Sequence, residues 1–174
     1  MNLLRKDADM RLFENVQQLE QMCGSDSRWQ LAREAIELAP RLPVGSAYCL
    51  GSSVTLWHDS IRHLSEPAFI GKRMYYSVIS PLRGEAKVHL ADKSVLIRQT
   101  VYQDASDEEQ FIKGDSSDVR SVILVPGQVL IVETAEAYQI ANAGLDNEQV
   151  PQADCLLMHI TAAGRGLPEG TRSV

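Results

Sequence analysis

Apolar positions recur at helical spacing only in the first forty residues. From Met10 to Met22 they lie three or four residues apart, which predicts a helix over that range. A Gly-Ser-Asp-Ser break at 24–27 ends this helix and supplies an N-cap for a second helix over Arg28–Ala39. Pro40 ends the second helix because its ring cannot continue the hydrogen-bonding pattern. We expect the two helices to pack on one face or edge of a following sheet.

After Gly45 the apolar residues fall into short runs separated by turn residues. The runs predict strands near Ala47–Leu50, Val54–Asp59, Met74–Ser80, Ala86–Ala91, Val95–Tyr102, Ser121–Leu124, Val129–Glu133, Ala137–Ala141 and Leu156–Thr161. Many short strands at a spacing of ~8–12 residues are typical of a sandwich or barrel. Pro126-Gly127 lies between two apolar runs and predicts a tight turn. The sequence therefore predicts a mainly β, barrel or jelly-roll domain with two N-terminal helices.

The domain limits follow from composition. Residues 1–163 are interpreted as a single domain whose helical lead covers about residues 10–39. The acidic segment from Gln103 to Val119 is predicted to be a solvated excursion with a short strand around Gln110–Lys113. Residues 164–174 are rich in Gly, Arg, Pro and Ser and are predicted to form a loose tail.

Charge and cysteine content narrow the function classes. The 174 residues carry a net charge of −6 without a Lys/Arg run, which argues against nucleic acid as a partner. Neither a secretory signal nor an apolar stretch of membrane-spanning length is visible, so no membrane association is expected. Cys23, Cys49 and Cys155 are odd in number and widely separated, which indicates free thiols in a reducing compartment; Cys49 and Cys155 are interpreted as packing residues. We expect a cytoplasmic protein.

The histidines do not form a recognisable metal-binding pattern. No phosphate loop, G-x-S-x-G or H-E-x-x-H motif is present, and no H-x-H pair places two imidazoles on one strand face. His58 and His63 are interpreted as surface or strand-end residues, and His89 as lying on the polar side of a strand or on a pocket wall. His159 shares a strand face with Leu157, so it is either a pocket residue or a satisfied core histidine. We expect no bound metal and no other cofactor.

One predicted strand begins with cationic and hydroxyl side chains. Lys72, Arg73, Tyr75 and Tyr76 could supply donors for a carboxylate or sugar ligand. The alternative is an ordinary sheet face with an exposed basic end.

Several short signals in a fixed order together resemble a known family. They are Leu42-Pro43-Val44-Gly45, Gly51 followed by a β run, Arg73-Met74-Tyr75, Leu82-Arg83-Gly84-Glu85, Tyr102 with Asp107 and Phe111, and Pro126-Gly127. Their order and spacing over about residues 10–161 resemble the YhcH/YjgK/YiaL family, which includes the small subunit of the evolved β-galactosidase. The resemblance implies a cupin-like double-stranded β-helix with a central pocket, a role in carbohydrate metabolism, and a metal held by His and Glu side chains.

The sequence departs from this family at the positions that would hold the metal. Where the family has the Glu and His of E-x-H-R, this chain has Ile70 and Lys72, and the Asp and Gln of D-I-Q become Ser77 and Ile79. The later family histidine is replaced by Tyr138. A charged lysine has no lone pair for a metal, and Ile and Ser are poor ligands. The resemblance therefore implies a divergent member that lacks the metal ligands.

Two function classes remain open at this point. The first is a protein that binds or interconverts a small sugar or sugar acid in a metal-free barrel pocket. Its candidate ligand-binding residues are Lys72, Arg73, Tyr75, Ser77, Glu85, Tyr138 and His159. The second is a non-catalytic interaction or regulatory protein that uses the acidic segment and the helices as partner surfaces. An open pocket with unpaired Lys72 and Arg73 would favour the first class, and a crowded pocket filled by Ile70, Ile79 and tyrosines the second. A homodimer is compatible with either.

Overall fold

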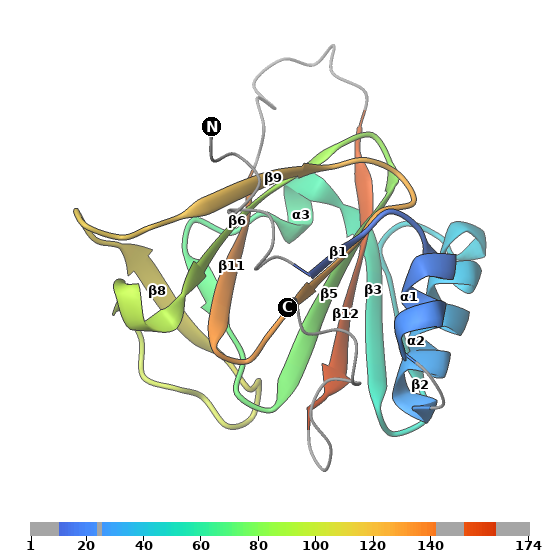
Figure 1. Cartoon of the computed structure of the whole chain (residues 1–174), viewed down its shortest axis with the longest axis horizontal. Helices are drawn as coiled ribbons and strands as arrows, with labels where there is room; N and C mark the ends of the chain where they lie inside the picture. Colours follow the sequence, from blue (N-terminus) through green and yellow to red (C-terminus); the bar gives the residue numbers. More distant parts are fainter. Residues whose placement is uncertain (1–10, 24–25, 142–151, 163–174) are drawn as a thin grey trace.

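The computed structural model describes residues 11–23, 26–141 and 152–162 (Figure 1). Its helices are α1 (Val16–Cys23), α2 (Ser27–Leu38), α3 (Ile61–Leu64), and the 3-10 helices η1 (Ala39–Arg41) and η2 (Lys93–Val95). The strands before residue 93 are β1 (Arg11–Phe13), β2 (Ser46–Leu50), β3 (Val54–Ser60), β4 (Phe69–Gly71), β5 (Tyr75–Arg83) and β6 (Ala86–Asp92). The later strands are β7 (Leu96–Arg98), β8 (Glu109–Lys113), β9 (Arg120–Leu124), β10 (Val129–Val132), β11 (Glu136–Ala141) and β12 (Asp154–Thr161). The tail predicted for residues 164–174 lies outside the described residues.

The strands form two six-stranded antiparallel sheets. Sheet A has the order β1-β10-β5-β12-β3-β2, and sheet B has the order β7-β8-β4-β11-β6-β9. The predicted turn at Pro126-Gly127 connects the sheets, since β9 belongs to sheet B and β10 to sheet A. In this turn the Gln128 amide donates to the Val125 carbonyl over 3.1 Å, and Gly127 has a φ of +94°. The prediction of a mainly β protein is confirmed.

An apolar core joins the two sheets. Sheet A contributes Ile79 and Leu130, while sheet B contributes Val88, Leu90 and Ile140, all at most 1% exposed. Alternation along each strand sends these residues to one face and their sequence neighbours to the other. The space between the sheets is thus packed with aliphatic side chains over this region.

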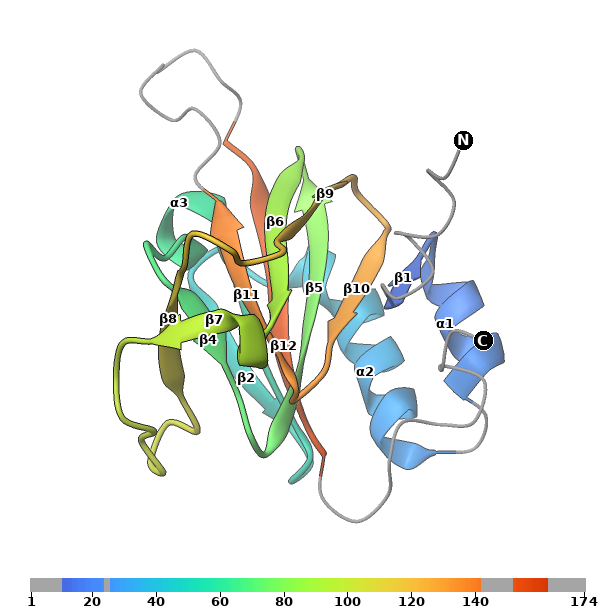
Figure 2. The ribbon, with the colours of Figure 1, turned by 60° about the vertical axis from the view of Figure 1, so that its left-hand side comes forward.

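A second core lies between the helices and the opposite face of sheet A (Figure 2). Trp29 and Ala32 of α2 pack in one cluster with Leu56, Leu156 and Met158 of β3 and β12. The mostly apolar stripe of α2 is therefore buried on the sheet. The predicted packing of the helices on one sheet face is confirmed.

The first helix is shorter than the sequence predicts. Residues Arg11–Phe13 form β1, which pairs with β10, and α1 begins only at Val16. The side chain of Asn15 accepts a hydrogen bond from the Gln18 amide over 2.8 Å, which is the geometry of an N-cap. Strand pairing and this cap take precedence over the helical spacing of the apolar residues. The second helix was predicted well, and Asp26 within the predicted break is its N-cap.

Two other predicted segments are wrong in part. The strand expected at Val95–Tyr102 is reduced to β7, because η2 occupies the preceding residues. The acidic segment after it is not fully solvated, since Asp107 and Glu109 are 4% and 2% exposed. The strand β4 was missed because it has only three residues.

Candidate functional site

A group of polar and aromatic side chains lies on the inner face of sheet A, the face turned toward sheet B. Tyr76, Val78, Met158 and Ile160 pack against the helices, so the residues that alternate with them face inward. The inward residues are Ser77 and Tyr75 of β5, His159 of β12 and Trp57 of β3. With Tyr138 of β11 they form what we name the inner polar cluster.

Strand register brings this cluster together. Ser77 and His159 are direct cross-strand partners on β5 and β12. The Ser77 side chain lies close enough to the Tyr138 hydroxyl to affect its pKa, so β11 of sheet B faces β5 of sheet A at this point. The His159 ring lies 4.8 Å from the Trp57 ring in an edge-to-face arrangement and 6.4 Å from the Tyr75 ring, measured between centroids.

His159 has an unusual hydrogen-bonding state. Its Nε2 atom is buried and has no partner among the described residues. Burial lowers the pKa of His159 to about 3, and the nearby positive charge of Lys72 acts in the same direction. The ring is therefore neutral at neutral pH. A buried polar atom without a partner costs free energy, so it is a natural place for a ligand or water to bind.

The positions at which the sequence differs from the motifs of the family that it resembles lie close together in the structure. Ile70 and Tyr138 are cross-strand partners on β4 and β11, and Tyr138 contacts Ser77 on β5. Ile70, Lys72, Ser77 and Tyr138 are 6%, 6%, 2% and 5% exposed. The sequence comparison thus points to one buried region rather than to scattered substitutions.

Lys72 is not free to hold a ligand. Its Nζ donates to the Ser106 carbonyl over 3.0 Å and forms an ion pair with Glu108 over 3.4 Å. Both partners belong to the segment between β7 and β8. Sequence reasoning did not foresee that this acidic segment would supply the counter-charge.

Arg73 is also committed to an ion pair, on the outer side of sheet B. Its guanidinium donates to Glu109 over 2.9 and 3.3 Å and stacks over the Tyr102 ring at 4.0 Å. Glu109 also binds Lys93 at 3.0 Å and Arg98 at 3.4 Å. The hydrogen bond from Arg73 is the largest cause that lowers the pKa of Glu109. The buried carboxylate of Glu109 therefore contacts three cationic side chains.

Asp107 lies next to these ion pairs and holds the segment between β7 and β8 against the residues that precede β5. Its carboxylate accepts hydrogen bonds from the Arg73 and Met74 amides, at 2.9 and 3.0 Å, and from the Tyr102 hydroxyl at 2.6 Å. The hydrogen bond to Asp107 raises the pKa of Tyr102 to about 12. The Tyr-to-Asp spacing noted in the sequence therefore has a structural role, because it ties the loop to the start of β5.

The remaining predicted site residues are distributed as follows. Tyr75 is half-buried at the edge of the inner polar cluster. Glu85 lies in the exposed turn between β5 and β6, at the other end of β5 from Tyr75. The structure therefore brings together Lys72, Tyr75, Ser77, Tyr138 and His159, but neither Arg73 nor Glu85 joins them.

His58 is a correction to the sequence analysis, which interpreted it as a surface or strand-end residue, because it is buried within β3. It is 4% exposed; its Nε2 lies 2.7 Å from Asp154, and its Nδ1 lies 2.8 Å from the Leu42 carbonyl. Arg83 binds the other oxygen of Asp154 at 2.8 Å. Cys49 is a second correction, since it is exposed, whereas Cys155 is buried as expected.

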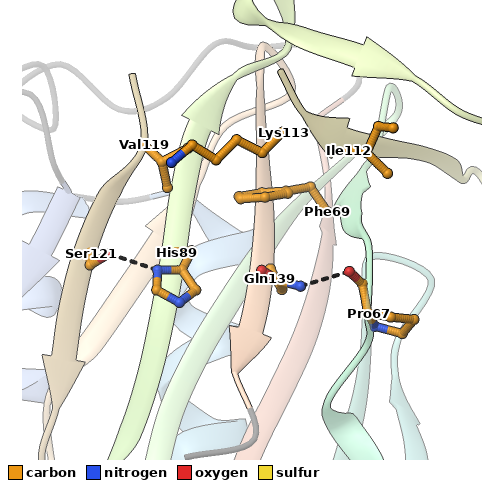
Figure 3. Close-up of a pocket in the computed structure, with 8 residues that line it drawn as sticks. All are labelled: Pro67, Phe69, His89, Ile112, Lys113, Val119, Ser121 and Gln139. Atoms are coloured by element: carbon orange, nitrogen blue, oxygen red, sulfur yellow. Dashed lines mark hydrogen bonds between the residues drawn. The ribbon is translucent and has the colours of Figure 1, made fainter. Parts of the chain in front are cut away.

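A separate pocket of about 380 Å³ lies on the outer face of sheet B (Figure 3). Its lining residues come from five strands and the segments next to them: Pro67, Phe69, His89, Ile112, Lys113, Val119, Ser121 and Gln139. His89 Nδ1 lies 2.6 Å from the Ser121 hydroxyl, and the Gln139 amide donates to the Pro67 carbonyl over 2.8 Å. His89 lies on the same face of β6 as the exposed Lys87, which is the polar side of the strand, and it also lines this outer pocket.

Metal-ligating side chains are not gathered in the part of the chain that the structure describes. No group of three or more His, Cys, Asp or Glu side chains there could hold a metal ion. The absence of a bound metal stays a prediction, which elemental analysis of protein purified without added metal would test. Within the described ranges, no helix is long and apolar enough to cross a membrane.

Comparison with known proteins gives distant likenesses. No protein-family model matches the sequence. The chain is similar to E. coli ycfD, with 11% identity and a TM-score of 0.37, over 79% of this chain and 30% of that one. It is also similar to vicilin from Corylus avellana (hazelnut), with 11% identity and a TM-score of 0.35, over 71% of this chain and 34% of that one. The chain spans about a third of the length of each, and neither likeness carries an argument about function.

Proposed function

We propose that the chain is a cupin-like protein of carbohydrate metabolism that binds a small sugar at the inner polar cluster without a metal. The proposed double-stranded β-helix is supported by the strand order. Strands β3, β12, β5 and β10 are neighbours in sheet A, and β4, β11, β6 and β9 are neighbours in sheet B. In chain order, β3, β4, β5 and β6 alternate between sheet A and sheet B. Strand β9 lies in sheet B like β6, and β10, β11 and β12 then alternate again, which is the order of a jelly roll.

The observation that carries the ligand proposal is the unpartnered Nε2 of His159 beside half-buried aromatic rings. A sugar hydroxyl would supply the missing hydrogen bond, whichever tautomer His159 adopts. The C–H faces of a pyranose ring would pack on Trp57 and Tyr75, which are both half-buried and so within reach of solvent. Small-ligand sites commonly combine apolar walls with a few placed polar groups in this way.

The charges favour a neutral sugar over a sugar acid. Lys72 and Arg73, which were expected to hold a carboxylate or hydroxyls, are already paired with Glu108 and Glu109. A ligand carboxylate would have to displace one of these pairs. The proposed ligand is therefore an uncharged sugar.

Binding is favoured over interconversion of the sugar. Effective general acids and bases have pKa values near the working pH. Burial lowers the pKa of His159 and raises that of Tyr138, so one pKa lies well below neutral pH and the other well above it. Neither is suited to take up and release a proton at the anomeric oxygen.

Saturation-transfer and exchange NMR with glucose, galactose and N-acetylneuraminic acid test this proposal. The expected result is saturation transfer to a neutral sugar without faster anomer exchange, and loss of transfer in His159→Phe, which keeps a ring against Trp57. His63→Phe is the matched control, because the His63 side chain is 72% exposed. Equal transfer in the two variants would contradict the proposal.

A second candidate function is a non-catalytic interaction protein. It is favoured by the burial of Ile70 and Ile79 and by the ion pair of Lys72 with Glu108, which fill the region where the resemblance places a pocket. Absence of saturation transfer from every sugar tested would favour this candidate. A pull-down from the native host would then identify the partner.

A further inference from the structure

The pocket on the outer face of sheet B contains a cation without a counter-charge. Lys113, at the end of β8, forms no ion pair or side-chain hydrogen bond within the described ranges, and the pocket lining includes no acidic residue. Figure 3 shows its side chain extending from β8 toward Val119. In a protein with a net charge of −6, such an unneutralised lysine in a concave site marks a place for an anion.

Further polar groups converge on the same pocket. His89 is half-buried, and its Nδ1 is joined to the exposed Ser121 hydroxyl. The Gln139 side-chain amide is committed to the Glu66 and Pro67 carbonyls, which fixes its orientation and leaves its oxygen available. His89, Ser121 and Gln139 lie on three neighbouring strands of sheet B, so the sheet holds their spacing.

Positive charge extends over this part of the sheet. Burial lowers the pKa of His89, and the charges of Lys87 and Lys113 add to that effect. The two lysines are therefore close enough for His89 to experience their field. A ligand carboxylate would neutralise part of that field.

Apolar side chains complete the pocket. Phe69, Val119, Ile112 and Pro67 line it, and Phe69 lies near the centre of the view in Figure 3. The volume of about 380 Å³ falls in the range of small-molecule sites. The site thus combines one cation, a few hydrogen-bonding groups and an apolar wall.

We propose that this outer pocket binds a small organic carboxylate with an apolar body, whose carboxylate contacts Lys113 and whose body packs on Phe69 and Val119. The site is distinct from the inner polar cluster, because β4, β6 and β11 place its residues on the opposite face of sheet B from Ile70, Leu90 and Tyr138. The proposal for the outer pocket is therefore independent of the sugar proposal, and either can fail without the other.

An NMR titration with benzoate, benzamide and acetate tests the proposal. Benzoate has both the charge and the apolar body, benzamide keeps the shape without the charge, and acetate keeps the charge without the ring. We expect benzoate to bind more tightly than either, with backbone amide shifts at Ser121, Gln139 and Ile112. An exposed charge pair is worth about fivefold in affinity, so Lys113→Gln should weaken benzoate by about that factor and leave benzamide unchanged.

Lys87→Gln is the matched comparison, since Lys87 contributes to the same field but does not line the pocket, and its loss should weaken benzoate binding less than the loss of Lys113. The same spectra show whether each variant is folded. Equal affinity of benzoate and benzamide would overturn the proposal. So would equal benzoate affinity in the two lysine variants, or shifts confined to the inner polar cluster.

Discussion

Replacing Glu109 with glutamine tests the ionic network on the outer side of sheet B. The Glu109 side chain is 3% exposed and contacts three cations: Arg73 at 2.9 Å, Lys93 at 3.0 Å and Arg98 at 3.4 Å. Glutamine keeps the shape of the side chain but removes its charge, and its NH₂ group cannot accept hydrogen bonds. The substitution therefore removes the charge and one hydrogen-bond-accepting oxygen while it keeps the volume of the side chain.

The expected loss in free energy of unfolding depends on how exposed the three cationic side chains are. Removing one partner of a fully buried ion pair costs about 3–5 kcal/mol. Arg73 and Arg98 have side chains that are 45% and 58% exposed, so water can replace their contacts, whereas Lys93 is 16% exposed. We therefore expect Glu109→Gln to lower the free energy of unfolding by about 2–3 kcal/mol, below the fully buried case. For a chain of this size the melting temperature should fall by roughly 4–12 °C.

Urea denaturation at several pH values measures this difference. The pKa of Glu109 is lowered in the folded state, first by the hydrogen bond from Arg73, relative to its ordinary value of 4.5. Its contribution to stability is then fully present above pH 4.5 and is lost as the pH falls through the folded-state pKa. The difference in free energy of unfolding between wild type and Glu109→Gln should be constant near neutral pH and should become smaller in acid.

Glu85→Gln serves as the control, because Glu85 is exposed in a turn. A loss of less than about 0.5 kcal/mol for Glu109→Gln would refute the reasoning, since that is the scale of an ordinary surface substitution. A gap that does not narrow in acid would show that charge is not the cause.

Three further predictions concern buried and strained positions. His58→Phe removes both hydrogen bonds of a buried imidazole and leaves a buried carboxylate with one partner fewer, so it should cost about 2–4 kcal/mol in urea denaturation. In the native state iodoacetamide should modify exposed Cys49 but not Cys155, because burial raises the pKa of Cys155 to about 12; mass spectrometry reads this out. Gly84→Ala should cost about 1–2 kcal/mol, because the φ is +70° and the new Cβ would lie 2.7 Å from a neighbouring side chain. Gly127→Ala, with a φ of +94° but open space, should cost less by thermal denaturation.

The strand pattern could be predicted from the sequence because period-two alternation acts locally. The runs containing β3, β6, β11 and β12 were located to within two residues at each end. The helix at residues 27–38 was also located well, since it has both a cap and a terminating proline. β1 was not predicted, because its three residues are ordered only by pairing with β10, which is far away in the chain.

The candidate site was predictable in part. Ser77, Tyr138 and His159 were named from the sequence, and strand register brings them together. The ion pairs of Lys72 and Arg73 could not be foreseen, because their partners lie 36 residues later in a segment whose acidic composition indicated solvation. Sequence composition does not say which carboxylates of an acidic segment turn inward.

The outer pocket was not predicted as a site. Only the alternation around His89 gave a pocket wall as one of two positions for this side chain. Lys113, Ser121 and Gln139 lie on different strands, and no local pattern connects them. Their assembly depends on the order β4-β11-β6-β9 within sheet B, which is set by long-range pairing.

The most direct test of the central claim is a long-range ¹H–¹⁵N correlation spectrum of the histidine side chains, recorded with and without galactose. Only four histidines are present, so the ring nitrogens can be assigned with single substitutions. We expect the His159 Nε2 resonance to shift as a sugar hydroxyl binds it, while the resonances of His58 and His63 stay unchanged. Saturable sugar binding that leaves the His159 nitrogens unchanged would contradict this claim.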